Sequence, residues 1–226
     1  MTKSEKRTGA GAHRSPAPPA DEAASAAALG STEIPAPATD GAGAVGDACP
    51  AVPGPEVRVR RARADDAGTI AEIVVRGWQA AYRGILPGGF LAGLSVAARE
   101  VAWRSILESD GQGAAPAWIA EVEGRAVGFV ASGPQRDEDV PLLTAEVYAI
   151  YVLPEAWRQG VGRALLETAA DHWRGGGAAT LVLWVFEANA RGRAFYTALG
   201  WHADGALRQV ELGGVSITEI RHRLAL

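Results

Sequence analysis

The sequence predicts a mixed α/β domain, in which one sheet carries helices on both faces. Three observations predict it. Some runs have apolar residues at strand spacing, others have them at helical spacing, and all 15 aromatic residues of the 226-residue chain fall in residues 56–226. Those 171 residues are enough for one domain, which would bury about 70% of its unfolded surface.

Residues 1–55 precede this domain and have the composition of a disordered extension. Ala, Pro and Gly occupy 30 of the 55 positions, and none is aromatic. Too little bulky apolar surface is present to offset the entropy of ordering the segment. We therefore expect an Ala/Pro/Gly-rich N-terminal extension at residues 1–55 and one folded domain at residues 56–226.

The first part of the domain is expected to form one strand and two helices. Residues 57–60 alternate in polarity and predict the strand. A helix follows, capped by Asp65 or Asp66 and broken before the Pro87-Gly88-Gly89 cluster. The second helix is expected at residues 95–108. Its apolar positions would be Val101, Trp103 and Ile106.

The middle of the domain is expected to form a hairpin and a long strand. Residues 118–122 and 126–131 have strand composition and flank a turn at 123–125. An acidic loop at 134–141 then leads to a strand at 143–153.

The last part of the domain alternates helices and strands. The almost wholly apolar run at 180–186 is typical of a strand that is covered on both faces. The remaining elements are a helix at 160–173, a short helix from Asn189 to Leu199, and strands at 206–212 and 215–223. The complete pattern gives about seven strands and four helices.

Charge and residue usage exclude several functions. The chain has 22 basic and 26 acidic residues, a net charge of −4, and no basic segment that would bind nucleic acid. Lysine occurs only at positions 3 and 6, which excludes a Schiff-base or phosphate-loop lysine in the domain. The single cysteine, Cys49, lies in the extension, so the domain has no cysteine nucleophile.

Membrane and metal binding are not expected either. No apolar run approaches the roughly 18 residues of a membrane helix, and no secretory signal is expected. We therefore expect a cytoplasmic protein. His172, His202 and His222 lack metal-ligand spacing, so no metal is expected. A homodimer is left open.

The segment from Glu146 to Leu166 carries the strongest functional signal. A strand runs into a loop that contains Gly160 and Gly162 and opens a helix. Such a helix start presents main-chain N–H groups and the positive end of the helix dipole, which together bind anions. Both glycines let a pyrophosphate approach without a Cβ in the way. An ordinary tight turn is the alternative interpretation of this loop alone.

Other motifs fit the sequence less well. A dinucleotide-binding fingerprint would place a third glycine at position 165, where the chain has Leu165. A triphosphate-binding loop needs a lysine that the domain lacks. No Gly-x-Ser-x-Gly turn is present, which argues against a serine hydrolase.

A second block follows the first at a characteristic distance and includes Asn189, Ala194-Phe195-Tyr196 and Leu199-Gly200-Trp201. With both blocks, the sequence resembles the GNAT superfamily of acyl-CoA-dependent N-acetyltransferases over nearly all of residues 56–226. The resemblance implies a GNAT-type, mostly antiparallel central sheet. The loop matches the family pattern Gln/Arg-x-x-Gly-x-Gly/Ala except at its first position, where Trp157 stands.

The resemblance implies acetyl-CoA as co-substrate. Main-chain N–H groups of the glycine loop would hold the pyrophosphate, the strand edge at Tyr151 and Val152 would pair with the pantetheine arm, and Asn189 would contact the pantetheine amides. Asn189 also suits a helix N-cap. The cofactor-binding residues expected from the resemblance are Tyr151, Val152, Arg158, Gln159, Gly160, Val161, Gly162, Arg163, Asn189 and Tyr196.

Acetyl transfer to an amine needs a base, because an alkyl ammonium with a pKa of about 10.4 must first lose a proton. Glu146 lies 14 residues before Gly160, the offset of the general base in histone-type members of the family. We expect Glu146 to share a strand face with Tyr148, Ile150 and Val152. A solvated or salt-bridged glutamate is the alternative.

The resemblance also assigns an acid and an oxyanion donor. Tyr196 would protonate the departing thiolate, or position its sulfur, and the Val152 N–H would stabilise the developing oxyanion. A packing tyrosine is the alternative for Tyr196. Direct attack in a ternary complex remains as the route, because the domain has no cysteine to form a covalent acetyl-enzyme.

The acceptor pocket is expected around Tyr82 and Arg83, the candidate substrate-binding residues. Asp137, Glu138 and Asp139 would either attract a cationic amine or form a solvated loop. The chain is thus expected to be an N-acetyltransferase that moves acetyl from acetyl-CoA to a primary amine of a small molecule or a protein. The alternative is a non-catalytic acyl-CoA-binding sensor or regulatory module.

Overall fold

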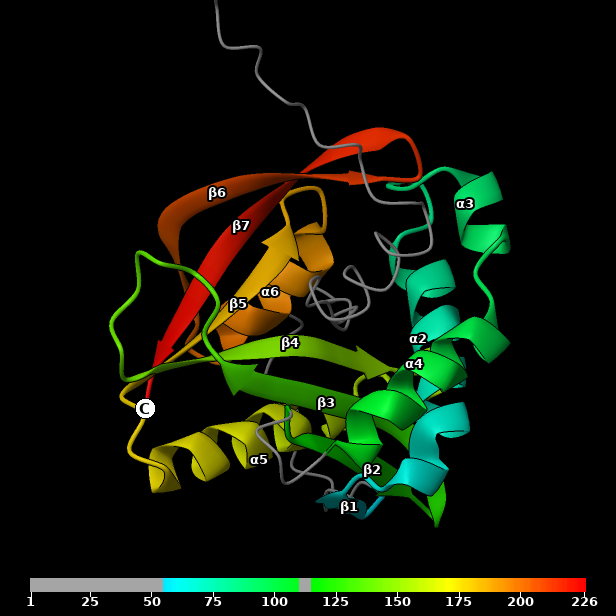
Figure 1. The fold of residues 1–226 in the computed structure, drawn as a ribbon, viewed down its shortest axis with the longest axis horizontal. Helices are drawn as coiled ribbons and strands as arrows, with labels where there is room; N and C mark the ends of the chain where they lie inside the picture. Colours follow the sequence, from blue (N-terminus) through cyan, green and yellow to red (C-terminus); the bar gives the residue numbers. More distant parts are fainter. Residues whose placement is uncertain (1–54, 110–114) are drawn as a thin grey trace, which may run out of the picture.

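The computed structural model describes residues 55–109 and 115–226, in which it has seven strands and five α-helices (Figure 1). The strands are β1 (Val57–Arg61), β2 (Ala117–Val122), β3 (Arg125–Pro134), β4 (Thr144–Val152), β5 (Thr180–Phe186), β6 (His202–Leu212) and β7 (Val215–Ala225). The helices are α2 (Ala67–Ala81), α3 (Gly88–Ala92), α4 (Val96–Glu108), α5 (Val161–Gly175) and α6 (Ala190–Ala198), with short 3-10 turns η1 (Ala64–Asp66) and η2 (Pro154–Ala156). The predicted extension, except for Pro55, lies outside the described residues.

The strands form one sheet in the order β1-β2-β3-β4-β5-β7-β6. Every neighbouring pair is antiparallel except β4 and β5, which run parallel. Helix α5 covers one face, and α2 and α4 cover the other (Figure 1). The predicted mixed α/β class with a mostly antiparallel sheet is confirmed. Among the described helices, none has the length and apolar character needed to cross a bilayer.

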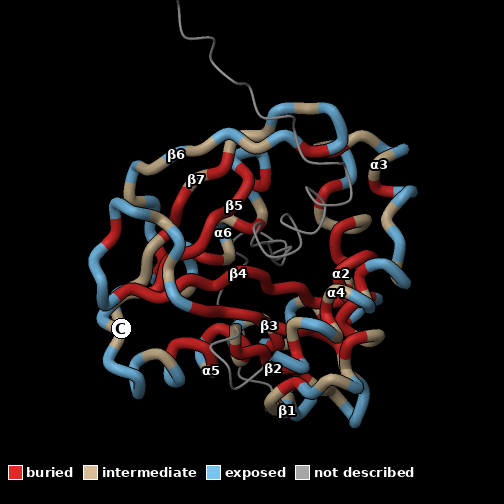
Figure 2. The backbone as a smooth tube through the Cα atoms, viewed as in Figure 1, coloured by how far each residue is buried: buried red, intermediate tan, exposed pale blue. Residues whose placement is uncertain are grey.

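An apolar core lies on each face of the sheet. Leu165 of α5 packs with Ile150 beneath it, and Trp78 and Trp103 of α2 and α4 pack with Phe129 on the opposite face. Burying side chains of this size stabilises the fold by roughly 1.5–3 kcal/mol each. Figure 2 shows β3, β4 and β5 buried along most of their length. These strands therefore provide a rigid frame for any site built at their ends.

Strand β4 contains a bulge that changes which residues share a face. Ala131 and Ser132 are consecutive in β3 but pair with Ala149 and Val147 of β4. Tyr148, which lies between those two β4 residues, therefore has no partner in β3. The extra residue shifts the alternation of side chains. As a result Val147, Ile150 and Val152 all lie in the core beneath α5, and Glu146 lies on the opposite face. The prediction that Glu146 shares a face with Ile150 and Val152 is wrong.

Helix α4 buries a different stripe from the one expected. Trp103 and Leu107 are buried together with Arg99, and Val101 is 72% exposed. The guanidinium of Arg99 lies 5.3 Å from the ring centroid of Trp78, so an arginine takes a place on the buried stripe by stacking on an aromatic face. The prediction for Val101 is therefore wrong.

Two details near the start of the domain also differ from the prediction. Helix α3 begins at the Pro87-Gly88-Gly89 cluster, and its Phe90 fills the space beside Gly213 in the turn between β6 and β7. Asp66 sits at the N-cap of α2, but its carboxylate accepts hydrogen bonds from Arg60 and from the Arg63 N–H instead of capping the helix.

Candidate active site

Strands β4 and β5 pair only where they begin. The paired residues are 144–146 and 180–182, and from there β4 continues to Val152 paired with β3 only (Figure 1). The Leu153 N–H donates to the Val127 carbonyl of β3 at 2.8 Å. Because successive N–H groups of a strand point to opposite sides, the Val152 N–H points away from β3 and toward the side where β5 has separated. Beyond residue 146, this edge of β4 has no neighbouring strand in the described chain.

The loop before α5 presents a set of main-chain donors. Arg158 and Gly160 both have left-handed backbone conformations, with φ of 66° and 81°. In the described part of the chain, no main-chain N–H group of residues 158–163 donates a hydrogen bond. A Cβ placed on Gly160 would meet no atom within 4 Å. Convergent N–H groups at a helix N-terminus form an anion site that fits a pyrophosphate.

Trp157, which departs from the family pattern, anchors this loop. Its Nε1–H donates to the Val152 carbonyl at 2.8 Å. The guanidinium of Arg191 in α6 lies 3.8 Å from the centroid of the Trp157 ring. The indole thus joins the loop to β4 on one side and to α6 on the other, and fixes where the donors of residues 158–163 point.

The side chains of the loop are engaged only at the surface. Arg158 is exposed, and the Gln159 amide donates to the Glu155 carbonyl at 2.9 Å. Arg163 lies 3.6 Å from Glu167 in an exposed pair on α5. Both guanidiniums are therefore accessible to a phosphate in solution, since exposed ion pairs of this kind are weak.

Asn189 caps helix α6, as predicted, and its side-chain Nδ2 remains available to a ligand. Its Oδ1 accepts from the Gly192 N–H at 2.8 Å, and the residue is 4% exposed. In the described residues its Nδ2 has no hydrogen-bond partner. An unpaired buried donor is unfavourable, so a ligand carbonyl at this position would be stabilised. A pantetheine amide has such a carbonyl.

Tyr196 lies on α6 and is completely buried. It belongs to the core beneath α5, together with Val147 and Ile150 of β4. Its ring lies 6.2 Å from the imidazole of His222, whose pKa is lowered by burial. Tyr196 and Glu146 therefore lie on opposite faces of the sheet.

Glu146 is buried in an ion pair, which we named from the sequence as the alternative to a role as general base. Its side chain is 1% exposed, and both carboxylate oxygens accept hydrogen bonds from the Arg136 guanidinium, at 2.6 and 3.0 Å. The same guanidinium lies 4.2 Å from the ring centroid of Tyr148. Burial raises the pKa of Tyr148 to about 12, and its hydroxyl donates to the Pro134 carbonyl.

The two predicted acceptor residues are placed differently from each other. Tyr82 is fully buried, 4.7 Å from the ring of Phe186 at the end of β5. Arg83 is exposed. Tyr151, expected at the pantetheine edge, accepts through its hydroxyl from the Nε1–H of Trp78 at 2.8 Å. Tyr82 and Tyr151 thus form part of the wall between α2 and the sheet.

The acidic loop between β3 and β4 is tied to the sheet by Arg221. Asp137 and Asp139 accept from its guanidinium at 3.1 and 2.6 Å, and Asp204 accepts at 2.8 Å. The hydrogen bonds from Arg221 lower the pKa of Asp139. Trp184 donates to Asp137 as well. Arg221 thus holds the loop in place through Asp137 and Asp139, a contact that no sequence motif predicted.

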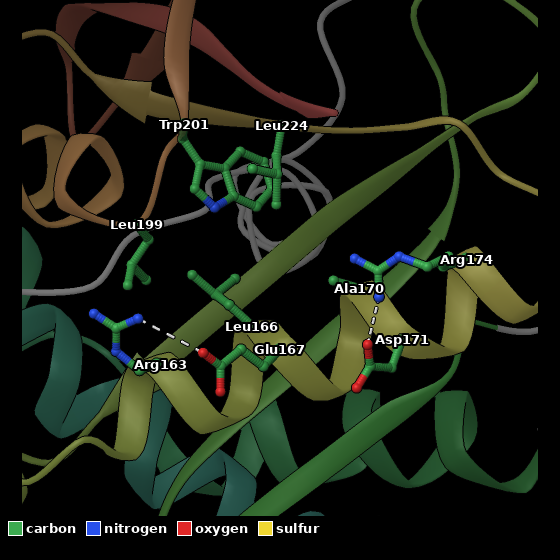
Figure 3. A pocket seen from close by; sticks show the side chains of 9 residues that line it. All are labelled: Arg163, Leu166, Glu167, Ala170, Asp171, Arg174, Leu199, Trp201 and Leu224. Atoms are coloured by element: carbon green, nitrogen blue, oxygen red, sulfur yellow. Dashed lines mark hydrogen bonds and ion pairs between the residues drawn. The ribbon is translucent and has the colours of Figure 1, made fainter. Parts of the chain in front are cut away.

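A separate hollow of about 330 Å³ lies between α5 and the ends of α6 and β7 (Figure 3). Its apolar wall includes Leu166, Trp201 and Leu224, and its charged rim includes Arg163 and Arg174. Arg163 lies in the first turn of α5 and its main-chain N–H is one of the donors of residues 158–163, so the hollow adjoins the anion site. Among the described residues, no three His, Cys, Asp or Glu side chains gather as a metal site would require.

Known proteins resemble this chain in sequence. Residues 87–201 match the acetyltransferase (GNAT) family. The N-acetyltransferase YuaI of Bacillus subtilis is 33% identical over 165 residues, which cover 73% of this chain and 90% of that protein. An N-acetyltransferase of Archaeoglobus fulgidus is 29% identical over 164 residues, which cover 70% of this chain and 97% of its own.

Solved structures show the same fold. The PaiA N-acetyltransferase of Thermoplasma acidophilum, in complex with coenzyme A, has a TM-score of 0.62 at 17% identity and covers 76% of this chain and 99% of its own. The structure of yncA from Salmonella typhimurium with its cofactor acetyl-CoA has a TM-score of 0.57 at 22% identity, covering 76% and 94%. Because the family match spans half of the sequence and YuaI is 33% identical over most of it, the chain belongs to the GNAT acetyltransferase family and is an acyltransferase.

Proposed function

We propose that the chain transfers an acetyl group from acetyl-CoA to a primary amine by direct attack in a ternary complex. One observation carries the proposal: the main-chain N–H groups of residues 158–163 donate no hydrogen bond within the described chain, and they lie just beyond the end of β4, where β4 has separated from β5. A diphosphate at these donors would leave the rest of the molecule to extend along β4. Neighbours in the same fold bind coenzyme A or acetyl-CoA.

Different residues of the chain would contact the pyrophosphate and the pantetheine arm of acetyl-CoA. Gly160 leaves space for the pyrophosphate, with Arg158 and Arg163 at the rim. The β4 edge around Val152 would pair with the pantetheine arm, and Asn189 Nδ2 would donate to one of its carbonyls. Acetyl-CoA, when bound, supplies an activated acetyl thioester.

Proton transfer would be divided between the two faces of the sheet. Glu146 would take the proton from the acceptor ammonium, directly or through water, and the Tyr196 hydroxyl would donate a proton to the departing sulfur. The nitrogen loses two protons in all: the first passes through Glu146 to solvent before attack, and the second leaves as the nitrogen–carbon bond forms and the carbon–sulfur bond breaks, and it replaces the proton that Tyr196 gives to the thiolate. The products are the amide, CoA thiol and one proton in solvent. The Val152 N–H, which the resemblance made the oxyanion donor, lies six strand residues or about 20 Å from Glu146 and so does not fit that role beside this base; it would instead pair with the pantetheine arm.

The acceptor would enter on the face that carries Glu146, between α2 and the β6–β7 hairpin. Tyr82 supports the wall of this face, and Arg83 lies at its exposed edge. Two neighbours, from Brucella melitensis and Escherichia coli, are ribosomal-protein alanine N-acetyltransferases, so a protein N-terminus belongs among the acceptors to test beside small amines. A cytoplasmic location stays a prediction.

The proposal is tested by the release of free thiol from acetyl-CoA. The chain would be incubated with spermidine, phenethylamine, an aminoglycoside and an alanine-starting peptide, each against a sample without amine. We expect thiol release with at least one amine, and acetylation of that amine by mass spectrometry. Binding of acetyl-CoA with no release for any amine in a broadened panel would instead favour a non-catalytic sensor.

A further inference from the structure

We propose that the Arg136 guanidinium occupies the position at Glu146 that the ammonium group of the acceptor takes in the complex. The ammonium displaces the guanidinium when the acceptor binds, so the site selects protonated amines by exchanging one cation for another. This inference rests on the proposed function and deepens it. It names the charge of the acceptor, the atom group that receives it, and a residue that must move aside before the amine can bind.

The first support is that the buried Glu146 carboxylate has Arg136 as its sole hydrogen-bond partner among the described residues. It is 1% exposed, yet it accepts from the Arg136 Nη2 at 2.6 Å, from Nε at 3.0 Å and from the main-chain N–H of the same residue at 3.2 Å. In the described chain no other residue is hydrogen-bonded to that carboxylate. Because a buried carboxylate is strongly unfavourable without a cation, any ligand that removes Arg136 must supply a positive charge in its place.

The second support is the position of Glu146 in the sheet. It pairs with Val182 at the last rung that β4 and β5 share, and it faces away from α5. From Glu146 to Val152 the strand advances by six residues, or about 20 Å at 3.3 Å per residue. The anion site and the carboxylate therefore lie at opposite ends of the edge along which the acyl-carrying arm would extend.

The third support is that Arg136 can leave while its loop stays. Its side chain is 40% exposed and rests on the ring of Tyr148. The next residue, Asp137, is fixed by Arg221, whose side chain is only 6% exposed and which also binds Asp139. A rotation of the Arg136 side chain into solvent thus removes the guanidinium from Glu146 without detaching the loop between β3 and β4.

The chemistry of the exchange favours a primary ammonium. It is a compact cation with three donors, so it can satisfy both carboxylate oxygens where the planar guanidinium now binds in a fork. A neutral hydroxyl acceptor brings no charge and would leave the carboxylate without a cation. The same contact that selects the ammonium also places its proton beside the group proposed to remove it.

Removal of the Arg136 side chain tests this competition. Steady-state rates would be measured with the fastest amine of the panel for the natural chain, for Arg136→Ala, and for Arg104→Ala as a matched control in an exposed pair with Glu100. We expect KM for the amine to fall about tenfold in Arg136→Ala, equivalent to 1.4 kcal/mol. We expect kcat to stay within a few-fold and Arg104→Ala to behave as the natural chain.

Added methylguanidinium gives a readout that a merely structural role would not move. In Arg136→Ala it should compete with the amine and return KM toward the natural value, with little effect on Arg104→Ala. If Arg136→Ala does not fold, Arg136→Gln carries the same test. An unchanged or higher KM, or no effect of methylguanidinium, overturns the inference alone. If no chain releases thiol with any amine, the proposed function fails, and this inference fails with it.

Discussion

Replacement of Gly160 by valine is expected to abolish measurable acetyl-CoA binding while leaving the protein folded. The Cβ and methyl groups would enter the space in front of the N–H groups of residues 158–163, where the pyrophosphate is proposed to lie. We expect the dissociation constant to rise at least about 100-fold, or 2.7 kcal/mol, as measured by calorimetry.

The matched control is Gly177→Val, just beyond the end of α5. Gly177 has φ of 84°, close to the 81° of Gly160, and neither position has an atom within 4 Å of an added Cβ. Both variants should therefore lose a similar stability of about 1–2 kcal/mol, from the left-handed backbone alone. Equal affinities for acetyl-CoA in the two variants would remove the loop from the binding site.

Removal of the Tyr196 hydroxyl is the second change with a large expected effect. In Tyr196→Phe we expect kcat to fall about 100- to 1000-fold, because general acid catalysis contributes factors of this size. The affinity for acetyl-CoA should change by less than about threefold, since the buried ring and its packing remain. Single-turnover kinetics beside calorimetry separate the two quantities.

Thr197→Val serves as the control for Tyr196→Phe. Thr197 is the next residue of α6, and its exposed hydroxyl donates to the Arg193 carbonyl at 2.9 Å. It removes a hydroxyl from the same helix without approaching β4. Wild-type turnover in Tyr196→Phe would show that Tyr196 only packs in the core, which is the alternative that its complete burial allows.

The strands were predictable because their signal is local. Alternating or continuous apolar runs located all seven of them, and Ser95 and Asn189 marked two helix starts that the structure confirms. The short helix α3 was missed because it depends on distant packing, with Phe90 against the β6–β7 turn. The bulge at Tyr148 left no trace either, because β4 is buried on both faces and its pattern does not alternate.

The candidate site likewise has one part that local sequence predicts and one part that depends on the tertiary fold. The donors around Gly160 follow from a strand, a glycine loop and a helix that are adjacent in sequence, so the motif could predict them. The ion pair of Arg136 with Glu146 depends on the register of β3 with β4, and Arg221 reaches Asp137 across 84 positions of the chain. Such contacts are set by the tertiary fold, and no spacing in the sequence encodes them.

The most direct test of acetyl-CoA binding follows the amide signals of the isotope-labelled protein by NMR during a titration with acetyl-CoA. We predict saturable shifts of residues 158–163 and of Val152 below about 1 mM, the upper end of ordinary substrate affinities. Signals of the β1–β2 edge should not move. If the signals of residues 158–163 stay fixed at that concentration, the main-chain donors do not hold the pyrophosphate, and the proposed mode of catalysis is contradicted.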